Sequence, residues 1–253
     1  MARQFRQGLL CAGVAMALIA PYSRAQTTSS TVPLSVSVMR VDPSPRAVTF
    51  TVQNTGTKTV SAWHVRIAVG TEPDAAGGGY GVDAFRSLEG LFTGASSYIR
   101  PNELVTATAD LPQGTKSVAP VVITPTTAVF ADPSFAGDAT FAQSVFDQRR
   151  QQLEAWQEIE GLLQEARTRG TVDANALEQL LVTIDNSIAQ HRDDVVRRTF
   201  RTNLALRLTD VRAGRAQALQ VVTGMLDEAS RNIAAVAAHF SPLAARGESC
   251  RAM

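Results

Sequence analysis

Cysteine and histidine are scarce in this chain, and their scarcity excludes several kinds of site. The cysteines are Cys11 and Cys250, and the histidines are His64, His191 and His239. No two of these residues have the spacing of a zinc site, and one late cysteine cannot build a thiolate cluster. Cys250 with His239 would also lack the rigid scaffold that a nucleophile pair needs. We therefore expect no metal site and no thiol catalysis.

Short catalytic motifs are missing as well. The chain has no Gly-x-Ser-x-Gly elbow and no phosphate-binding glycine loop that ends in Lys-Ser or Lys-Thr. Gly79 to Ala84 fits the dinucleotide-binding pattern, but no strand–helix–strand unit surrounds it, so we expect a loop there. Asp132 to Asp138 lacks the alternating oxygen ligands of a calcium loop. The sequence predicts no catalytic residue and no cofactor, and thus a protein that is not an enzyme.

Long apolar runs are absent except near the start. Arg3 and Arg6 precede an uncharged stretch, Leu9 to Ala20, of about twelve residues, whereas a membrane-spanning helix needs ~20. A small-x-small cleavage site follows at Ser23-Arg24-Ala25. Residues 1–26 therefore resemble a secretory signal peptide, which predicts a periplasmic or secreted protein with no membrane span.

Removal of this leader would leave Cys250 as the only thiol in the mature chain. An intramolecular disulfide is then impossible, although exported proteins often depend on one. We expect the fold to be held together by burial of side chains alone.

Residues 32–137 have the alternating pattern of β-strands. The segments are rich in Val, Thr, Ile and Phe and are separated by Gly, Pro and Asn, which is typical of an antiparallel β-sandwich. Pro120 and Pro125 indicate edge positions or bulges, and His64 is expected to point to solvent. The expected strands are Leu34–Arg40, Ala47–Gln53, Val60–Val69, Glu103–Leu111, Val118–Thr124 and Thr126–Phe130.

The stretch from Ala47 to Val69 contains an apolar strand, the turn Asn54-Thr55-Gly56 and a second strand with Trp63. It resembles secreted bacterial immunoglobulin-like domains of the cell-adhesion-related type. The resemblance implies an immunoglobulin-like sandwich used for adhesion, spacing or recognition, and it implies no catalytic residues.

Residues 138–242 have helical periodicity instead. Asp138 and Asp173 are expected N-caps, Gly170 ends the first helix, and Gly214 kinks or divides a later one. Helices of this length bury their apolar stripes against each other as an antiparallel bundle. The predicted fold class is therefore α+β, with a sandwich, a helical bundle and a flexible tail at 243–253. Because no linker separates the halves, they are expected to pack as one unit.

The segment between the third and fourth strands is the candidate recognition loop, because it is long for a connection and binding residues gather in such loops. The alternative is a structural lid. Its candidate recognition residues are Tyr80, Asp83, Arg86, Glu89, Tyr98 and Arg100. A carboxylate enzyme using the 71–103 loop and Arg86 would require at least two of Asp74, Asp83, Glu89 and Glu103 to converge in one pocket.

The stretch from Arg192 to Arg215 holds seven arginines. Phe200 is its only aromatic residue, and single-stranded nucleic acid binders interleave aromatics with basic residues. We expect no nucleic-acid partner and assign these arginines to ion pairs within the bundle, because the preceding helices are acidic.

These patterns together predict an exported, non-enzymatic binding or structural protein of the cell envelope. Its partner would be an envelope protein or polymer. An envelope chaperone or assembly factor, which offers a sheet edge or a helical groove to clients, is the main alternative. Such a chaperone would need a large exposed apolar patch on the bundle.

Overall fold

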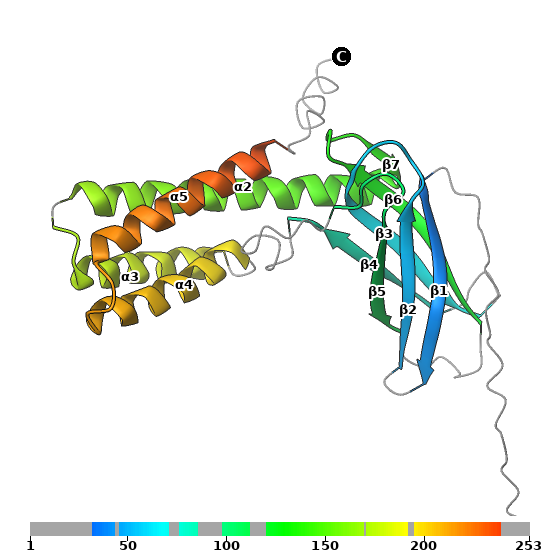
Figure 1. The fold of residues 1–253 in the computed structure, drawn as a ribbon, viewed down its shortest axis with the longest axis horizontal. Helices are drawn as coiled ribbons and strands as arrows, with labels where there is room; N and C mark the ends of the chain where they lie inside the picture. The colour runs from blue at the N-terminus through cyan, green and yellow to red at the C-terminus, as the bar shows by residue number, and fades with distance from the viewer. Residues whose placement is uncertain are drawn as a thin grey trace, which may run out of the picture.

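The computed structural model describes residues 32–43, 46–70, 76–85, 98–111, 120–169, 171–191 and 195–238. Two antiparallel sheets fill the first half of these residues and four helices fill the second (Figure 1). The predicted α+β fold class is confirmed. The predicted leader and the predicted tail lie outside the described residues.

Seven strands form the two sheets. Sheet A has the order β1-β2-β5 and sheet B has the order β4-β3-β6-β7, and all pairs are antiparallel. Their bounds are β1 (Leu34–Pro43), β2 (Arg46–Asn54), β3 (Val60–Val69), β4 (Ala76–Asp83), β5 (Leu104–Asp110), β6 (Val121–Phe130) and β7 (Phe135–Gly137).

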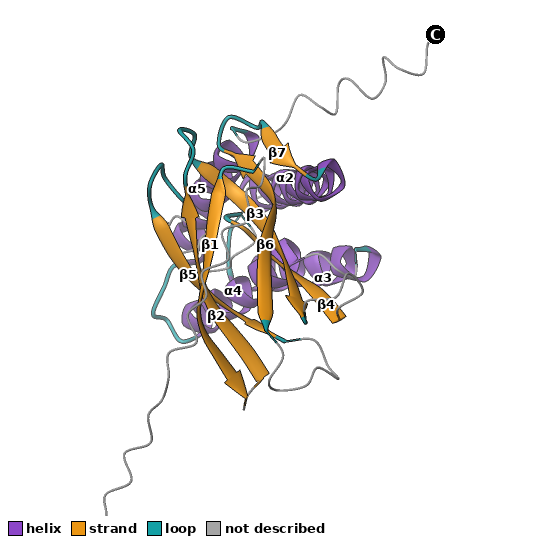
Figure 2. Cartoon of the chain, turned by 90° about the vertical axis from the view of Figure 1, so that its right-hand side faces the viewer, coloured by secondary structure: helices purple, strands orange, loops and turns teal. Residues whose placement is uncertain are grey.

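The two sheets lie next to each other (Figure 2). Their inner faces form one apolar core. Val48, Phe50 and Val52 of β2 are fully buried, as their alternation predicts. They pack with Trp63 of β3, whose ring lies 6.3 Å from that of Phe50 in an edge-to-face arrangement. Each such side chain contributes about 1.5–3 kcal/mol when it leaves water.

The segment from Gly70 to Arg100 differs from its expected form. Ala76 to Asp83, expected as loop, is the strand β4 and pairs with β3 along its length. Two predicted strands on either side of Pro125 are one strand, β6, which continues through a bulge beside that proline. Proline tolerates this position because a bulge interrupts the ladder of hydrogen bonds.

Four helices make up the bundle, and both predicted caps are confirmed. The Asp138 carboxylate accepts a hydrogen bond from Thr140 N at 2.8 Å, and the Asp173 carboxylate accepts one from Ala176 N at 2.9 Å. Gly214, at φ +70°, separates the last two helices. Their bounds are α2 (Ala139–Thr168), α3 (Ala174–Gln190), α4 (Val195–Arg212) and α5 (Ala218–Ala237).

The helix α2 belongs to both halves of the molecule (Figure 1). Its first turns lay Ala142, Val145 and Phe146 on the outer face of sheet B, against Ala62 and Val129. Its later turns enter the bundle core, with Trp156, Ile159 and Leu163 buried among the other helices. A helix of 30 residues is about 45 Å long at 1.5 Å per residue, so a single rod connects the sheets to the far end of the bundle.

Candidate functional site

The structure joins the sandwich to the bundle through a buried ion pair between Asp83 and Arg149. Asp83 ends β4 and is 6% exposed, and Arg149 lies in α2 and is 0% exposed. Arg149 Nη2 donates to Asp83 Oδ1 at 2.8 Å, and Arg149 Nε donates to Asp83 Oδ2 at 3.3 Å. This two-point contact fixes the direction of both side chains.

Ser61 of β3 completes the polar part of this joint. Its hydroxyl accepts a hydrogen bond from Arg149 Nη2 at 3.1 Å and lies 3.2 Å and 3.1 Å from the carbonyl oxygens of Val129 and Phe130, to which it donates. A hydroxyl bound in this way is not an activated nucleophile, because no base takes its proton. Ser61 therefore anchors the arginine to sheet B.

An apolar cluster surrounds the ion pair. The Arg149 guanidinium carbon lies 4.7 Å from the centre of the Phe85 ring, within the range of a cation–π contact. Phe85 also meets Tyr98 edge to face at 6.1 Å and packs with Val236 near the end of α5. We name Ser61, Asp83, Phe85, Tyr98 and Arg149 the joint cluster.

The surroundings of Tyr98 in the joint cluster shift the pKa of its hydroxyl. Burial raises the pKa of the Tyr98 hydroxyl, the nearby charge of Arg149 opposes this rise and Asp83 adds to it. The phenol thus stays protonated well above neutral pH, which suits a packing role rather than acid–base chemistry.

The four candidate recognition residues that the structure describes lie in different surroundings. Tyr80 packs into the sandwich core, 5.8 Å from the ring of Phe50 and 5.7 Å from that of Trp63. Asp83 and Tyr98 belong to the joint cluster, whereas Arg100 is exposed at a turn. Arg86 and Glu89 lie outside the described residues, and recognition through them stays a prediction.

The four candidate carboxylates of an enzyme site are likewise separated where they are described. Asp83 is held by Arg149, and Glu103 accepts a hydrogen bond from the backbone N–H of Arg100 at 2.8 Å. Asp74 and Glu89 lie outside the described residues. The two carboxylates that can be placed therefore serve structural contacts.

Arg149 was not among the predicted functional residues, although the sequence contains a signal for it. It occupies a position of the α2 stripe between Phe146 and Trp156 where an apolar residue is expected. A charged residue inside such a stripe is buried only when it is paired. Its partner, 66 residues away, has no local signal.

A second contact between sheet B and α2 is centred on His64, and the expectation that this side chain points to solvent is wrong. Its Nδ1 lies 2.6 Å from the hydroxyl oxygen of Thr126, and its ring lies 4.6 Å from that of Phe141 in α2. Burial lowers the pKa of His64, and the charge of Asp138 opposes this. A Cβ at Gly79 would lie 2.5 Å from His64 Nε2, so the bare backbone of β4 makes room for the imidazole.

Ion pairs inside the bundle match the predicted internal pairing of the basic stretch. Arg197 of α4, which is buried, pairs with Glu158 of α2, and the Ser187 hydroxyl of α3 donates to the same carboxylate at 2.6 Å. Burial raises the pKa of Glu158, but the hydrogen bonds from Arg197 and Ser187 outweigh burial and lower it overall. Arg201 and Asp185 pair across α4 and α3 at 2.9 Å.

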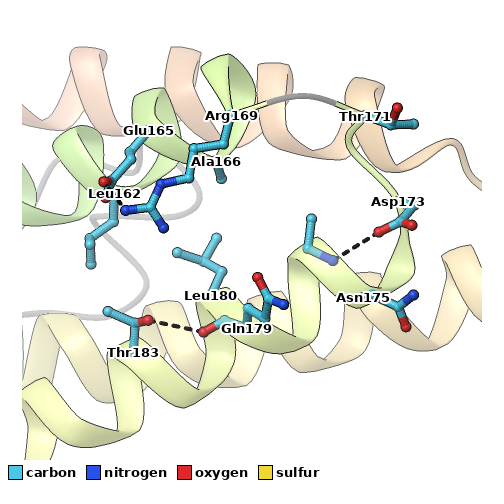
Figure 3. Close-up of a pocket in the computed structure, with 11 residues that line it drawn as sticks. Leu162, Glu165, Ala166, Arg169, Thr171, Asp173, Asn175, Gln179, Leu180 and Thr183 are labelled. Atoms are coloured by element: carbon cyan, nitrogen blue, oxygen red, sulfur yellow. Dashed lines mark hydrogen bonds and ion pairs between the residues drawn. The ribbon is translucent and has the colours of Figure 1, made fainter.

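A cleft of about 420 Å³ lies between the end of α2 and the start of α3 (Figure 3). Leu162 and Arg169 extend from α2 toward Leu180 of α3. Polar groups that line the cleft make contacts within the helices: Arg169 pairs with Glu165, and the Asp173 carboxylate caps α3. The cleft offers no nucleophile beside a general base among its described lining residues.

Two further searches of the described residues concern metals and membranes. No three His, Cys, Asp or Glu side chains gather there as metal ligands. None of the described helices has an apolar stretch long enough to cross a bilayer. The large apolar side chains that α3, α4 and α5 leave exposed are Val182, Val195, Leu206 and Leu219.

Comparison with known proteins finds no match: no family model, no curated protein and no solved structure is similar to this chain.

Proposed function

We propose that this protein is an exported, non-enzymatic structural or binding component of the cell envelope. In this role, the sandwich and the bundle are two binding bodies held at a fixed relative orientation. The observation that carries the proposal is the joint cluster, in which Arg149 of α2 is buried against Asp83 and Ser61 of sheet B.

The physical argument begins with the cost of this joint. Burial of an ion pair removes two charges from water, and the penalty is recovered only with good geometry and further hydrogen bonds. Such a pair contributes little net stability, but it strongly disfavours any arrangement in which one partner is left buried alone. A joint of this kind suits a protein whose two halves must keep one orientation.

The immunoglobulin-like assignment of the sandwich is part of the proposal. The turn Asn54-Thr55-Gly56, on which the resemblance depends, is held to the sandwich by hydrogen bonds, and this supports the assignment. The Asn54 side chain is fully buried and donates to the carbonyl oxygens of Lys58 at 2.8 Å and Ile99 at 2.9 Å. Its own oxygen accepts from Gly56 N at 3.0 Å. An adhesion-type sandwich would present its loops and outer face to an envelope protein or polymer.

Export is tested by fractionation of the native host. We expect the protein in the periplasm or the medium, with an N-terminus created by cleavage at the Ser23-Arg24-Ala25 site. A chain that retains Met1 and stays in the cytoplasm would contradict the proposal.

Binding is tested by a photo-crosslinking amino acid placed at exposed positions of each half, such as Thr108 of β5 and Leu206 of α4. We expect a defined crosslinked envelope component from at least one half, and its loss from both positions on competition with purified unlabelled protein. Crosslinks that such competition does not reduce would count against a specific binding role.

A further inference from the structure

Among the strands that the structure describes, β4 forms one edge of sheet B. Sheet B has the order β4-β3-β6-β7, so β4 pairs with β3 on one side and with no described strand on the other. Figure 2 shows β4 at the border of sheet B. An unpaired edge presents a row of backbone N–H and C=O groups to any other extended chain.

This edge lacks the features by which proteins normally prevent pairing. From Ala76 to Val82 it has neither a charged residue nor a proline, and Gly77, Gly78 and Gly79 are exposed. Lysines, prolines, bulges and very short strands are the usual protection of an edge. β4 has none of them along these residues, where its pairing with β3 is continuous.

The other edge strands carry such protection. β1 has a bulge between Val38 and Arg40, and Arg40 and Asp42 add charge on this strand. β7 has three residues, which is too short to guide pairing. β5 is also uncharged from Leu104 to Ala109, but its last residue, Asp110, is exposed, and exposed Glu103 precedes it. β4 differs because the aspartate that ends it, Asp83, is buried against Arg149.

Internal packing explains only part of the glycine content of β4. A Cβ at Gly79 would collide with His64, and one at Gly81 would lie 3.1 Å from Phe141. Gly77 and Gly78 are exposed and leave the outer part of the strand as bare backbone. Bare backbone allows another strand to approach without any requirement on its side chains.

We infer that β4 is a homodimer interface, in which β4 of one copy pairs antiparallel with β4 of a second copy and joins two sheets B into one. A twofold axis places β4 of one copy opposite the same residues of the other copy. Pairing therefore requires that the strand bring no like charges opposite each other. β4 meets this requirement because it is uncharged to Val82, and its one charged residue, Asp83, is held by Arg149. Like charges opposite each other would otherwise oppose pairing.

The positions of the bundles agree with this arrangement. The end of β4 lies at the bundle, because Asp83 contacts α2 and Phe85, two residues later, packs with Val236 of α5 (Figure 1). Antiparallel pairing reverses the direction of the second strand. The two bundles would thus lie at opposite ends of the joined sheet and would not collide. This inference goes beyond the proposed envelope role and does not depend on it.

The first test is sedimentation velocity of the purified protein over a range of concentrations. We expect a monomer–dimer equilibrium whose dissociation constant rises at least about tenfold in Gly78→Lys, because the substitution places two lysines in the pairing. The matched control is Thr106→Lys, which adds the same charge to the edge strand β5 and should leave the equilibrium unchanged. Circular dichroism checks that both variants fold.

The second test does not depend on a disruptive substitution. In a Cys11→Ser/Cys250→Ser background, single cysteines at Ala76, Gly77, Gly78 and Tyr80 are oxidised, and one close to the twofold axis should form a disulfide between copies. Amide hydrogen exchange of β4 should also slow as the protein concentration rises. A monomer at all concentrations, or a dimer that Gly78→Lys leaves intact and no β4 cysteine links, would overturn the inference.

Discussion

Arg149 shows how one side chain can govern the arrangement of two halves. Its guanidinium is fully buried, pairs with Asp83 and Ser61, and lies over the ring of Phe85. One of its nitrogens, Nη1, has no hydrogen-bond partner among the described residues. Desolvation of this group is therefore only partly compensated, and the pair is sensitive to the loss of either partner.

Replacement of Arg149 by alanine should destabilise the protein strongly, because it leaves the Asp83 carboxylate buried and unpaired. We expect the free energy of unfolding to fall by about 3–5 kcal/mol. The double variant Arg149→Met/Asp83→Leu should recover most of this loss. Chemical denaturation measures both.

The neighbouring arginine provides the control. Arg150 pairs with Asp147 on the surface, where both side chains are more than a third exposed. Its replacement by alanine should change the free energy of unfolding by less than about 0.5 kcal/mol. Equal effects at the two positions would show that burial of the Arg149 pair has no special role.

Two glycines offer a matched comparison of available space. A Cβ at Gly79 would lie 2.5 Å from His64 Nε2, whereas one at Gly161 in α2 would meet nothing within 4 Å. We expect Gly79→Ala to destabilise by about 1–3 kcal/mol. Gly161→Ala should stabilise by about 1 kcal/mol, because alanine favours the helix. Thermal unfolding of both variants measures these changes. If Gly79→Ala does not lower the stability, His64 does not occupy this space.

At the scale of elements, α2 connects the layers because its faces are divided along its length. The early turns present small and aromatic residues to sheet B, and the later turns present Trp156, Ile159 and Leu163 to the bundle. Its start is set by Asp138, whose carboxylate caps the helix and whose charge acts on the pKa of His64. The contact between His64 and Phe141 is thus next to the point where the sandwich ends and the helix begins.

This contact should depend on pH. Burial lowers the pKa of His64 below its usual 6.5, and Asp138 opposes the shift. A depressed histidine pKa means that the unfolded chain binds the proton more tightly than the folded one. The stability contributed by His64 is therefore complete above pH 6.5 and falls as the pH drops through the lower folded pKa.

His64→Phe tests this dependence, because phenylalanine keeps a ring on Phe141 without a titrating group. We expect the free energy of unfolding of this variant to lose less between about pH 7.5 and about pH 5 than that of the native protein. The His64 titration itself is followed by NMR. A His64 pKa at or above 6.5 would contradict the sign of the shift.

At the scale of the whole molecule, α2, α5 and the joint cluster make the sandwich and the bundle one body. The end of α5 reaches this joint through Val236, so two helices and the end of β4 contribute to it. The proposed binding surfaces on the two halves would then be held at a set distance from each other. This arrangement is what the proposed envelope role requires.

Rigidity can be measured as the distribution of distances between spin labels attached to cysteines at positions 108 and 206, in a Cys11→Ser/Cys250→Ser background. The native protein should give one narrow distribution, because both labels stand on exposed positions of packed elements. Arg149→Ala should broaden it, because the joint then loses its polar anchor. An equally narrow distribution in that variant would assign the rigidity to α2 alone.

The sequence by itself determined the class of the fold and much of its local structure. The alternation of apolar residues in β2 and the helix caps both depend on residues close together in the chain, so they could be recognised without any tertiary contact. Examples are Val48, Phe50 and Val52 in β2, and the caps Asp138 and Asp173. Only the tertiary structure decided that the glycine run of β4 is a strand. Glycine has low strand propensity, and here the partner strand β3 supplies the pairing.

The joint cluster was also decided by tertiary structure alone. Asp83 appeared as a loop carboxylate, and it became a buried anchor because the fold brings it against Arg149, which lies 66 residues away in the chain. The sequence around a charged residue does not indicate its partner, because the distance between two charged side chains is set by how the rest of the chain packs. Period and capping are local properties, whereas burial and pairing belong to the assembled molecule.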